Sequence, residues 1–407
     1  MKILHLSTTD IKGGAGIAAY RLHKGLLDSG VSSLMYVQRK SSDDKSIFSA
    51  ANKFNLFLAY FCAAGDKIFS NIFGPKNYEI TSFSVFSSFD IGVINKFNPD
   101  IVHLHWICGG FMSPKDISKI KKPIVWTMHD TWPFSGVRHY NLENTFYKTA
   151  NSSDTNFFEK LFWLRKKYFF SKLESLLAVS PSRWLAKEAA SSKLFRDVPI
   201  VVAGNGIDTN IFKPKDKTLS RKNIGLPVDK KILLFGAVDS LSGERKGYKL
   251  LLDIIKNIAP HNPKDCVLAV FGSSEKSSIN FDLPVYFLGN IKSEEALAEA
   301  YSAADIFIAP SIEDNLPNTV LESMSCGTPV AAFSIGGMPD MIDNDVNGIL
   351  SEPFNTRKLS SHILKILLSN EDLNKMSIEA RKKIVEHFDI KIAVKKYSDL
   401  YNSILNK

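Results

Sequence analysis

The chain has 407 residues, more than one hydrophobic core usually supports, so two domains of roughly 200 residues are expected. Its 44% apolar and 23% charged residues are typical of a soluble globular protein and exclude a disordered or fibrous chain. The net charge of +9 lies in residues 1–200, which hold 26 Lys/Arg against 16 Asp/Glu. This excess favours an anionic partner such as a phosphorylated substrate or a membrane. No nucleic acid is expected, because no compact basic and aromatic recognition motif is present.

The spacing of the cysteines and the length of the apolar runs indicate the cellular compartment of the protein. Cys62, Cys108, Cys266 and Cys326 lie far apart, which is typical of reduced thiols and excludes a cysteine-based zinc site. No signal peptide is expected. No membrane-spanning helix is expected either, because the longest apolar run, "FNLFLAYFCAAG", is followed at once by Asp66. We therefore expect a cytoplasmic protein.

Short aliphatic runs alternate with longer helical patterns along the whole chain. Strands are expected at 2–7, 33–38, 101–104, 124–128, 177–180, 200–202, 232–235, 267–271, 285–288, 306–309, 329–332 and 348–351. This alternation predicts α/β architecture, with two Rossmann-like, doubly wound parallel-sheet domains facing across a cleft. The expected organisation is an N-terminal domain (1–203), a linker (204–230), a C-terminal domain (231–385) and a helical tail that packs back toward the N-terminal domain (386–407).

The stretch "DIKGGAGIAAYRL" (10–22) contains G-x-G-x-x-A, which can mark a dinucleotide-binding turn. Six residues separate the expected strand end at Ser7 from Gly14, which is too long for that turn, and the second strand ends in Arg39 instead of an acid. An NADP-dependent oxidoreductase therefore stays as an alternative only. Gly13 and Gly14 would let a ligand approach, and a helix from Ile17 would point its amides at an anion. A loop whose glycines merely turn the chain explains the residues equally well.

The most informative segment is "APSIEDNLPNTVLESMSCGTPVAAFSIGGMPDMI" (309–342). A buried strand leads into a loop with Glu313 and Asp314, and a helix that contains Glu322 is expected to begin near Asn318. Carboxylates at a strand end accept hydrogen bonds from vicinal sugar hydroxyls, and the amides near Asn318 and Thr319 suit a diphosphate. Alternatively, the acids only favour the helix dipole or face solvent.

This segment resembles the donor-binding motif of the retaining glycosyltransferases of family 4, where an E-x7-E pair precedes "CGTPV" and "GG-x-P-E". "KGGAGIAAYRLHKGL", "TMHD", "GNGID" and "GERKGYKLLL" resemble further motifs of that family in the right order over residues 1–350. The resemblance implies a GT-B fold and metal-independent, retaining transfer of a sugar from a UDP- or GDP-sugar, without a cofactor. "HDTWPFSGVRHY" resembles the branch associated with exopolysaccharide, O-antigen and colanic-acid clusters.

The resemblance also implies roles for the acidic residues. Glu322 would bind the ribose of the donor, and Asp314 would contact the donor sugar. Asp314 is one methylene shorter than the family's Glu, so Glu313 is a candidate for the same contact. Pro317 replaces a residue that can donate an N–H. These departures keep a third interpretation open, in which the chain binds nucleotide sugars but has lost activity.

The basic and imidazole groups have implied roles as well. Lys246 matches the lysine that faces the diphosphate, where cations stabilise the leaving group. The family's arginine falls near Ala237 and is missing, so Arg245 is the candidate substitute. His129 matches the histidine beside the donor sugar; a buried structural histidine is the alternative.

A zinc site is a further alternative, because His103 and His105 share one strand face near His129 or His139. Two histidines without acid or cysteine partners are more often structural, so no metal is expected.

The stretch "FFEKLFWLRKKYFFSKL" (157–173) interleaves aromatic residues with Lys160, Arg165, Lys166, Lys167 and Lys172. As a helix it suits peripheral contact with an anionic membrane. Together with the basic first half, it favours a lipid-linked acceptor, such as a saccharide on undecaprenyl diphosphate, at the inner face of the cytoplasmic membrane. An ordinary core-packing helix with a solvated basic face is the alternative.

Overall fold

The computed structural model describes residues 1–50, 53–74, 80–140, 146–149, 157–236, 244–261, 265–272 and 281–406. The chain divides into two compact units: Met1–Gly206 with Ala393–Lys407, and Ile207–Ile392. The first boundary falls inside the segment expected to be a linker, and residues 207–230 belong to unit 2. The last helix, α15 (Ile390–Leu405), returns the chain to unit 1.

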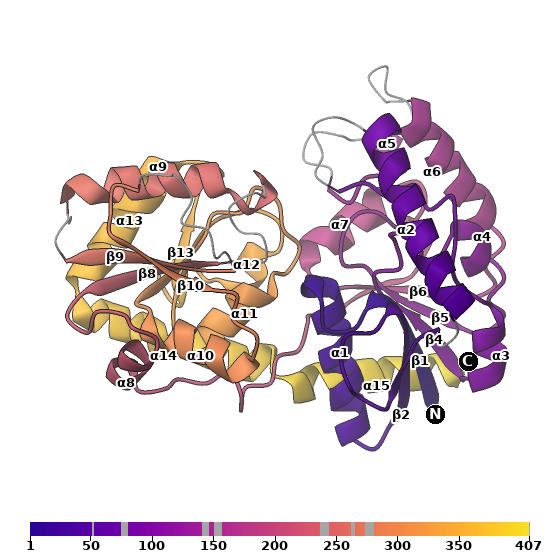
Figure 1. The fold of residues 1–407 in the computed structure, drawn as a ribbon, viewed down its shortest axis with the longest axis horizontal. Coiled ribbons are helices and arrows are strands. Elements are labelled where there is room, and N and C mark those ends of the chain that lie inside the picture. Colours follow the sequence, from indigo (N-terminus) through magenta and orange to yellow (C-terminus); the bar gives the residue numbers. More distant parts are fainter. Residues whose placement is uncertain are drawn as a thin grey trace. The chain divides into compact units, whose positions relative to one another are not determined.

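Unit 1 is built on a seven-stranded parallel sheet in the order β3-β2-β1-β4-β5-β6-β7 (Figure 1). Its strands are β1 (Lys2–Thr9), β2 (Ser32–Arg39), β3 (Ile47–Phe48), β4 (Ile101–Leu104), β5 (Ile124–Thr127), β6 (Leu176–Ser180) and β7 (Ile200–Val202). Its other helices are α1 (Gly13–Asp28), α2 (Lys53–Phe73), α3 (Gly92–Phe97), α4 (Pro114–Ile117), α5 (Phe146–Thr149), α6 (Phe157–Phe170) and α7 (Arg183–Ser191).

Unit 2 contains a six-stranded parallel sheet in the order β10-β9-β8-β11-β12-β13 (Figure 1). Its strands are β8 (Lys231–Gly236), β9 (Cys266–Phe271), β10 (Val285–Gly289), β11 (Ile306–Ala309), β12 (Val330–Phe333) and β13 (Gly348–Ser351). Its helices are α8 (Lys217–Asn223), α9 (Tyr248–Ile258), α10 (Glu294–Ala303), α11 (Asn318–Ser325), α12 (Met338–Met341), α13 (Thr356–Leu368) and α14 (Asn370–His387), with the 3-10 turns η1 (Glu244–Lys246) and η2 (Ala259–His261).

The predicted fold class is confirmed. All twelve expected strands are present to within two residues at either end, because buried parallel strands read as near-continuous aliphatic runs. The two-residue strand β3 was missed, since it pairs only Ile47 and Phe48 with β2 at the sheet edge. Helices cover both faces of each sheet; in unit 2, α9 and α13 pack on one core, α10 and α11 pack on the other, and α14 contributes residues to both.

The turn between β1 and α1 differs from the expectation. β1 continues to Thr9, so four residues instead of six separate the strand end from Gly14, and α1 begins at Gly13, four residues before Ile17. Asp10 in this turn accepts hydrogen bonds from the backbone N–H groups of Ser41 and Ser42 at 2.8–3.0 Å. The turn is thus two residues shorter than the sequence predicted, but Gly14 still does not follow the strand directly, as a dinucleotide turn requires.

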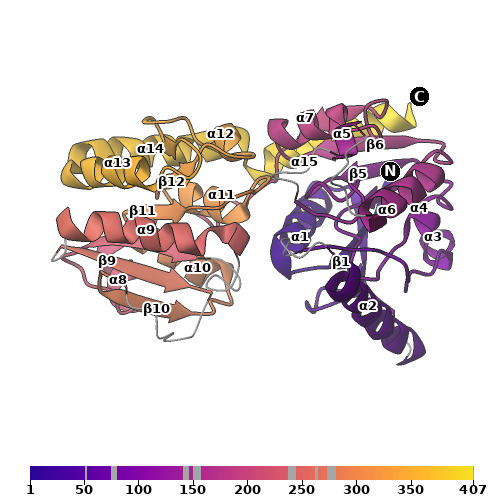
Figure 2. The same ribbon diagram turned by 90° about the horizontal axis from the view of Figure 1, so that it is seen from above.

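The expectation about membrane spans also needs correction. Within the described part of the chain, α2 is long and apolar enough to cross a membrane, by length and composition alone. Figure 2 shows this helix at the periphery of unit 1. Only 17% of its most apolar stretch is buried, whereas the core helix of a soluble protein is mostly buried. Asp66 does not end the apolar run; it lies inside the helix and is buried.

Candidate active site

Three loops of unit 2 meet at the carboxyl ends of β8, β11 and β12. Gly247, which precedes α9, has a φ of +73°, and a Cβ there would lie 1.8 Å from the carbonyl oxygen of Pro310. The neighbouring backbone is joined by a 2.8 Å hydrogen bond from Ile312 N to Arg245 O. On the other side, a Cβ at Gly336 would lie 1.9 Å from the carbonyl oxygen of Asp314. The "KG" and "GG" motifs thus allow close backbone contact on both sides of the acidic loop.

The basic and acidic candidates of these loops form one ion cluster. The ammonium of Lys246 lies 2.7 Å from Asp314 Oδ2, and the guanidinium of Arg245 lies 3.2 Å from the same oxygen. Arg245 also donates to the carbonyl oxygen of Glu313 at 3.1 Å. Burial would raise the pKa of Asp314, but the charges of Lys246 and Arg245 outweigh it and hold that pKa below its ordinary value. Asp314 is therefore ionised at neutral pH.

A small pocket lies beside this cluster. It is lined by Phe235, Gly236, Lys246, Phe307, Ile308, Ala309, Pro310, Ser311, Pro317 and Thr319. The amide end of α11 borders it, because α11 begins at Asn318 directly after Pro317. A lysine and a helix N-terminus at the carboxyl ends of central strands make a setting for phosphate groups. Ala237, where the family arginine was expected, lies outside the described residues.

The second acid of the motif lies deeper. Glu322 is on the second turn of α11, is 4% exposed, and accepts a 3.0 Å hydrogen bond from the hydroxyl of Tyr301. Glu313 is also buried. The structure therefore brings Arg245, Lys246 and Asp314 into direct contact. Glu313 meets this cluster through its carbonyl oxygen, which accepts from Arg245.

Unit 1 has its own pocket at the carboxyl ends of β4 and β5. It is lined by His105, Trp106, Ile107, Cys108, Trp126, His129, Asp130, Trp132 and Pro133. His129 follows β5 by two residues, as expected from "TMHD". Burial lowers the pKa of His129 to about 4, against the opposing effect of Asp130. The ring is therefore neutral at pH 7 and can donate a hydrogen bond to a ligand, or accept one from it, without adding charge.

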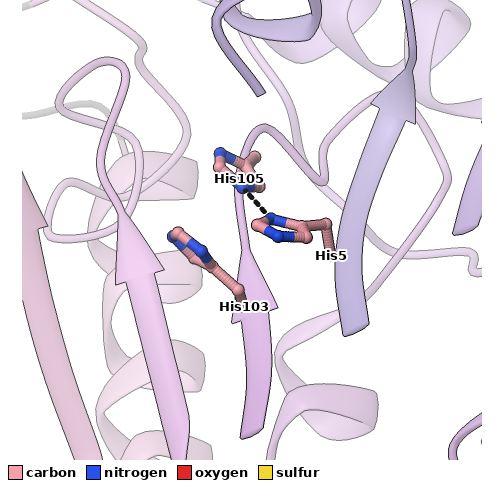
Figure 3. A group of neighbouring side chains, drawn as sticks. All are labelled: His5, His103 and His105. Carbon is pink, nitrogen blue, oxygen red and sulfur yellow. Dashed lines mark hydrogen bonds between the residues drawn. The ribbon is translucent and has the colours of Figure 1, made fainter. Parts of the chain in front are cut away.

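A row of histidines continues from His129 into unit 1. His129 Nε2 lies 3.2 Å from His105 Nδ1, and His105 Nε2 lies 2.9 Å from His5 Nδ1. His103 is beside them (Figure 3), and its two ring nitrogens contact the hydroxyls of Tyr401 and Thr127 at 2.7 and 2.8 Å. Burial, followed by the charges of neighbouring histidines, lowers the pKa values of His5, His103 and His105 well below 6.5.

The histidine cluster also bears on the zinc site that was the alternative for His103 and His105. Nitrogens of His5, His103 and His105 lie within 4.8 Å of one another, but His103 and His105 already use both ring nitrogens in hydrogen bonds. Among the described residues of this row, His5 Nε2 is the buried nitrogen without a hydrogen-bond partner. A metal would need at least two of these hydrogen bonds to break, so the donor set does not fit one.

Sequence reasoning missed the pair of Asp130 and His139. Asp130 Oδ2 lies 2.6 Å from His139 Nδ1 and accepts a 3.0 Å hydrogen bond from Trp106 Nε1. Burial would raise the pKa of Asp130, but His139 lowers it below its ordinary value. The pair fixes the loop after β5 that carries His129. The residues stand in "HDTWPFSGVRHY", so an aspartate and a histidine nine positions apart in a loop were the available signal.

Gly13 and Gly14 are exposed at the start of α1, and Gly13 has a φ of +71°. α1 has no side-chain N-cap hydrogen bond at Lys12. These two glycines stay candidates for contact with a ligand.

Comparisons with known proteins agree with this architecture. The family described as Glycosyltransferase Family 4 matches residues 12–211, and the family described as Glycosyl transferases group 1 matches residues 216–383. The solved structure of HepE from Anabaena, in complex with UDP-glucose, has a TM-score of 0.68 at 16% identity and covers 99% of this chain and 100% of that one. At that identity the likeness shows the fold.

Two curated relatives add detail. A D-inositol 3-phosphate glycosyltransferase of Thermobispora bispora is 29% identical over 193 residues, 44% of this chain and 45% of the relative. The N-acetyl-alpha-D-glucosaminyl L-malate synthase of Bacillus anthracis is 24% identical over 364 residues, 84% of this chain and 86% of the relative. Across the first three relatives, the match spans about half of their length, from 45% to 57%.

Two Rossmann-like units, with a lysine, a helix N-terminus and buried acids at the strand ends of the second, define the GT-B class of glycosyltransferase folds. Within that class, the two matched families place the chain among glycosyltransferases of the family 4 type.

Proposed function

We propose that the protein is a retaining glycosyltransferase that moves a sugar from a UDP- or GDP-sugar to a lipid-linked saccharide during surface-polysaccharide biosynthesis. The observation that carries the donor half is the meeting of Arg245, Lys246 and Asp314 beside the pocket at the start of α11. The complex of HepE with UDP-glucose supports a nucleotide-sugar donor. The acceptor, an undecaprenyl-diphosphate-linked saccharide, rests on the basic and aromatic character of unit 1 and on resemblance.

The proposed chemistry follows from the charges in the pocket. Asp314 pairs with both Lys246 and Arg245, so the cluster keeps a net charge of about +1. A bound diphosphate competes for these two cations and releases Asp314 toward the sugar hydroxyls. As the glycosidic bond breaks, charge grows on the diphosphate, and fixed cations stabilise it without a metal ion. Glu322 holds the ribose, while neutral His129 supplies a polar contact to the sugar.

Donor binding is the first test. A thermal-shift and calorimetry panel would compare UDP, GDP, their sugar conjugates and NADP. A ligand at a hundred times its dissociation constant should raise the free energy of unfolding by about 2.7 kcal/mol. Lys246→Ala should weaken nucleoside diphosphate binding at least tenfold, since a charge-assisted contact contributes about 1.5–3 kcal/mol. Lys249→Ala is the matched control, because Lys249 follows shortly after in the chain, is exposed and pairs with Glu244.

The outcomes separate the alternatives. Stabilisation by NADP alone would establish the oxidoreductase in place of the transferase. Donor binding without turnover on any lipid-linked saccharide would identify an inactive homologue. With turnover, NMR of the product anomer tests retention, and activity in excess EDTA tests metal independence.

A further inference from the structure

Helix α2 presents its large apolar side chains to solvent and its small ones to the protein. The buried residues of the helix are Ala59, Cys62 and Asp66. The opposite face is a stripe of exposed apolar residues along almost the whole helix: Phe54 (71% exposed), Phe57 (66%), Tyr60 (70%), Phe61 (55%), Ile68 (55%) and Ile72 (64%). A helix that only completes a core turns its large apolar residues toward the protein and its polar residues toward solvent. Exposed apolar patches of this extent mark interaction surfaces.

The inward face of α2 holds the helix firmly on unit 1. A Cβ at Gly110 would lie 2.4 Å from the backbone of Cys62, so the helix backbone packs directly on that loop. Asp66 accepts hydrogen bonds from the N–H groups of Phe83 and Ser84 at 2.9 and 2.7 Å. The exposed stripe is therefore a fixed surface of the folded unit.

A second helix, α6, contacts the C-terminal end of α2 and has an exposed apolar stripe of its own. The ring of Phe73 in α2 lies 4.7 Å from that of Phe158 in α6, and Phe83 contacts both helices. α6 contributes four more exposed apolar side chains: Phe157, Leu161, Leu164 and Tyr168.

The charges of the two helices point to one kind of partner. Each helix contains one acid, Asp66 or Glu159, and both are buried. Glu159 accepts from the backbone N–H groups of Gly136 and Val137. The lysines exposed on the two helices are Lys53, Lys67, Lys160 and Lys167. Lys166, expected on the basic face, is instead buried over the ring of Trp132. Within the described residues of α2 and α6, the exposed side chains thus combine aromatic groups with positive charge and include no acid.

We propose that the outer faces of α2 and α6 form a docking surface for an anionic lipid bilayer, with α2 lying in the plane of the membrane interface. Aromatic side chains enter the headgroup and acyl boundary, and the lysines contact lipid phosphates. The proposal deepens the proposed function, on which it rests, by assigning most of the apolar contact to α2, which sequence reasoning did not consider.

The contacts of α2 with the rest of unit 1 favour a helix that lies in the plane of the membrane interface over one that crosses the bilayer. To cross the bilayer, α2 would have to leave unit 1, which would strip Asp66 of its backbone hydrogen bonds and place the carboxylate in hydrocarbon. Burial already raises the pKa of Asp66, although the N–H groups of Ser84 and Phe83 oppose that change. The helix also keeps its Ser70 hydroxyl bonded to Thr81 O at 2.9 Å near its far end.

The test is co-sedimentation of the full chain with vesicles of phosphatidylcholine alone or with about 30% phosphatidylglycerol. The wild-type chain should bind the anionic vesicles, and binding should weaken as salt rises. Phe57→Ser with Phe61→Ser should lower the partition coefficient at least tenfold, whereas Leu368→Ser, an 80% exposed apolar residue of unit 2, should leave it unchanged. Lys53→Glu with Lys67→Glu, which removes no packed side chain, should abolish the preference for anionic vesicles.

Several outcomes would overturn the proposal. The first is a wild-type chain that stays in the supernatant with anionic vesicles. The second is normal vesicle binding by the variant with Phe57→Ser and Phe61→Ser. The third is a wild-type dimer that the same two substitutions dissociate. The last would show that a second copy covers the face. Nucleoside diphosphate binding, measured on the same samples, keeps the two proposals apart. Intact donor binding without vesicle binding refutes only the docking surface, and vesicle binding without donor binding refutes only the proposed transferase.

Discussion

Unit 1 should lose most of its stability between pH 7 and pH 5, before its carboxylates titrate. Five of its histidines have pKa values lowered by burial: His5, His23, His103, His105 and His129. The unfolded chain, in which a histidine titrates near 6.5, therefore binds more protons than the folded chain below that pH. The stability that comes from keeping these rings neutral is complete above pH 6.5 and is lost as the pH falls toward 4.

Two of these histidines set the size of the expected loss in the free energy of unfolding. The pKa values of His23 and His129 are both about 4. Between pH 7 and pH 5, each gains about three quarters of a proton in the unfolded chain and about a tenth in the folded chain, which costs roughly 2 kcal/mol. The two together account for roughly 4 kcal/mol, and His5, His103 and His105 act in the same direction. A typical domain has only about 5–15 kcal/mol to lose.

The tryptophans provide a selective assay. All five lie in unit 1: Trp106, Trp126, Trp132, Trp163 and Trp184. Urea unfolding followed by tryptophan fluorescence at several pH values therefore reports unit 1. His5→Leu should reduce the proton uptake on unfolding at pH 5 by about one. A loss below about 2 kcal/mol from pH 7 to pH 5 would refute the neutral, buried state of the row.

Two further predictions concern the donor site. Gly247→Ala should destabilise unit 2 by about 2 kcal/mol more than Gly225→Ala; both have a φ of +73°, but only the Cβ at Gly247 would collide, with Pro310 O. Chemical denaturation measures the difference, and equal losses would contradict the close loop contact. Glu322→Ala should abolish UDP or GDP binding in calorimetry, whereas Tyr301→Phe, which removes only the hydroxyl that donates to Glu322, should weaken it less than tenfold. Unchanged binding by the Glu322 variant would disprove its role at the ribose.

Local signals in the sequence were enough for the fold and for part of the site. Buried parallel strands are aliphatic and short, and Asn318 begins its helix where the pattern placed it. Strand ends were less visible: β1 runs on through polar residues, because Thr9 still pairs in register with Arg39 of β2. The contacts among His5, His105 and His129 depend on three strands meeting in register, which no single stretch of sequence encodes.

The amphipathic patterns of α2 and α6 did not reveal which face of each helix is buried, and the physical reason is a different one. A periodic pattern shows that a helix has two unlike faces but not which one meets the protein. In α2 the small stripe around Ala59 and Cys62 packs inward because the loop at Gly110 comes within backbone contact, which leaves no room for aromatic rings. In α6 the charges at Glu159 and Lys166 are satisfied by backbone groups of the 132–137 loop, so they are buried. Tertiary contacts decided both cases.

The distribution of charge separates the two proposed binding surfaces. The excess of positive residues lies in the first half of the chain, whereas the diphosphate candidates, Arg245 and Lys246, are in unit 2 and both pair with Asp314. Donor binding therefore depends on local geometry, because a bound diphosphate must replace one buried carboxylate at fixed cations. The docking surface instead depends on long-range attraction, which salt screens within about 8–10 Å. Raising the ionic strength should thus release the chain from anionic vesicles while weakening nucleoside diphosphate binding far less, and an equal loss of both would contradict this division of roles.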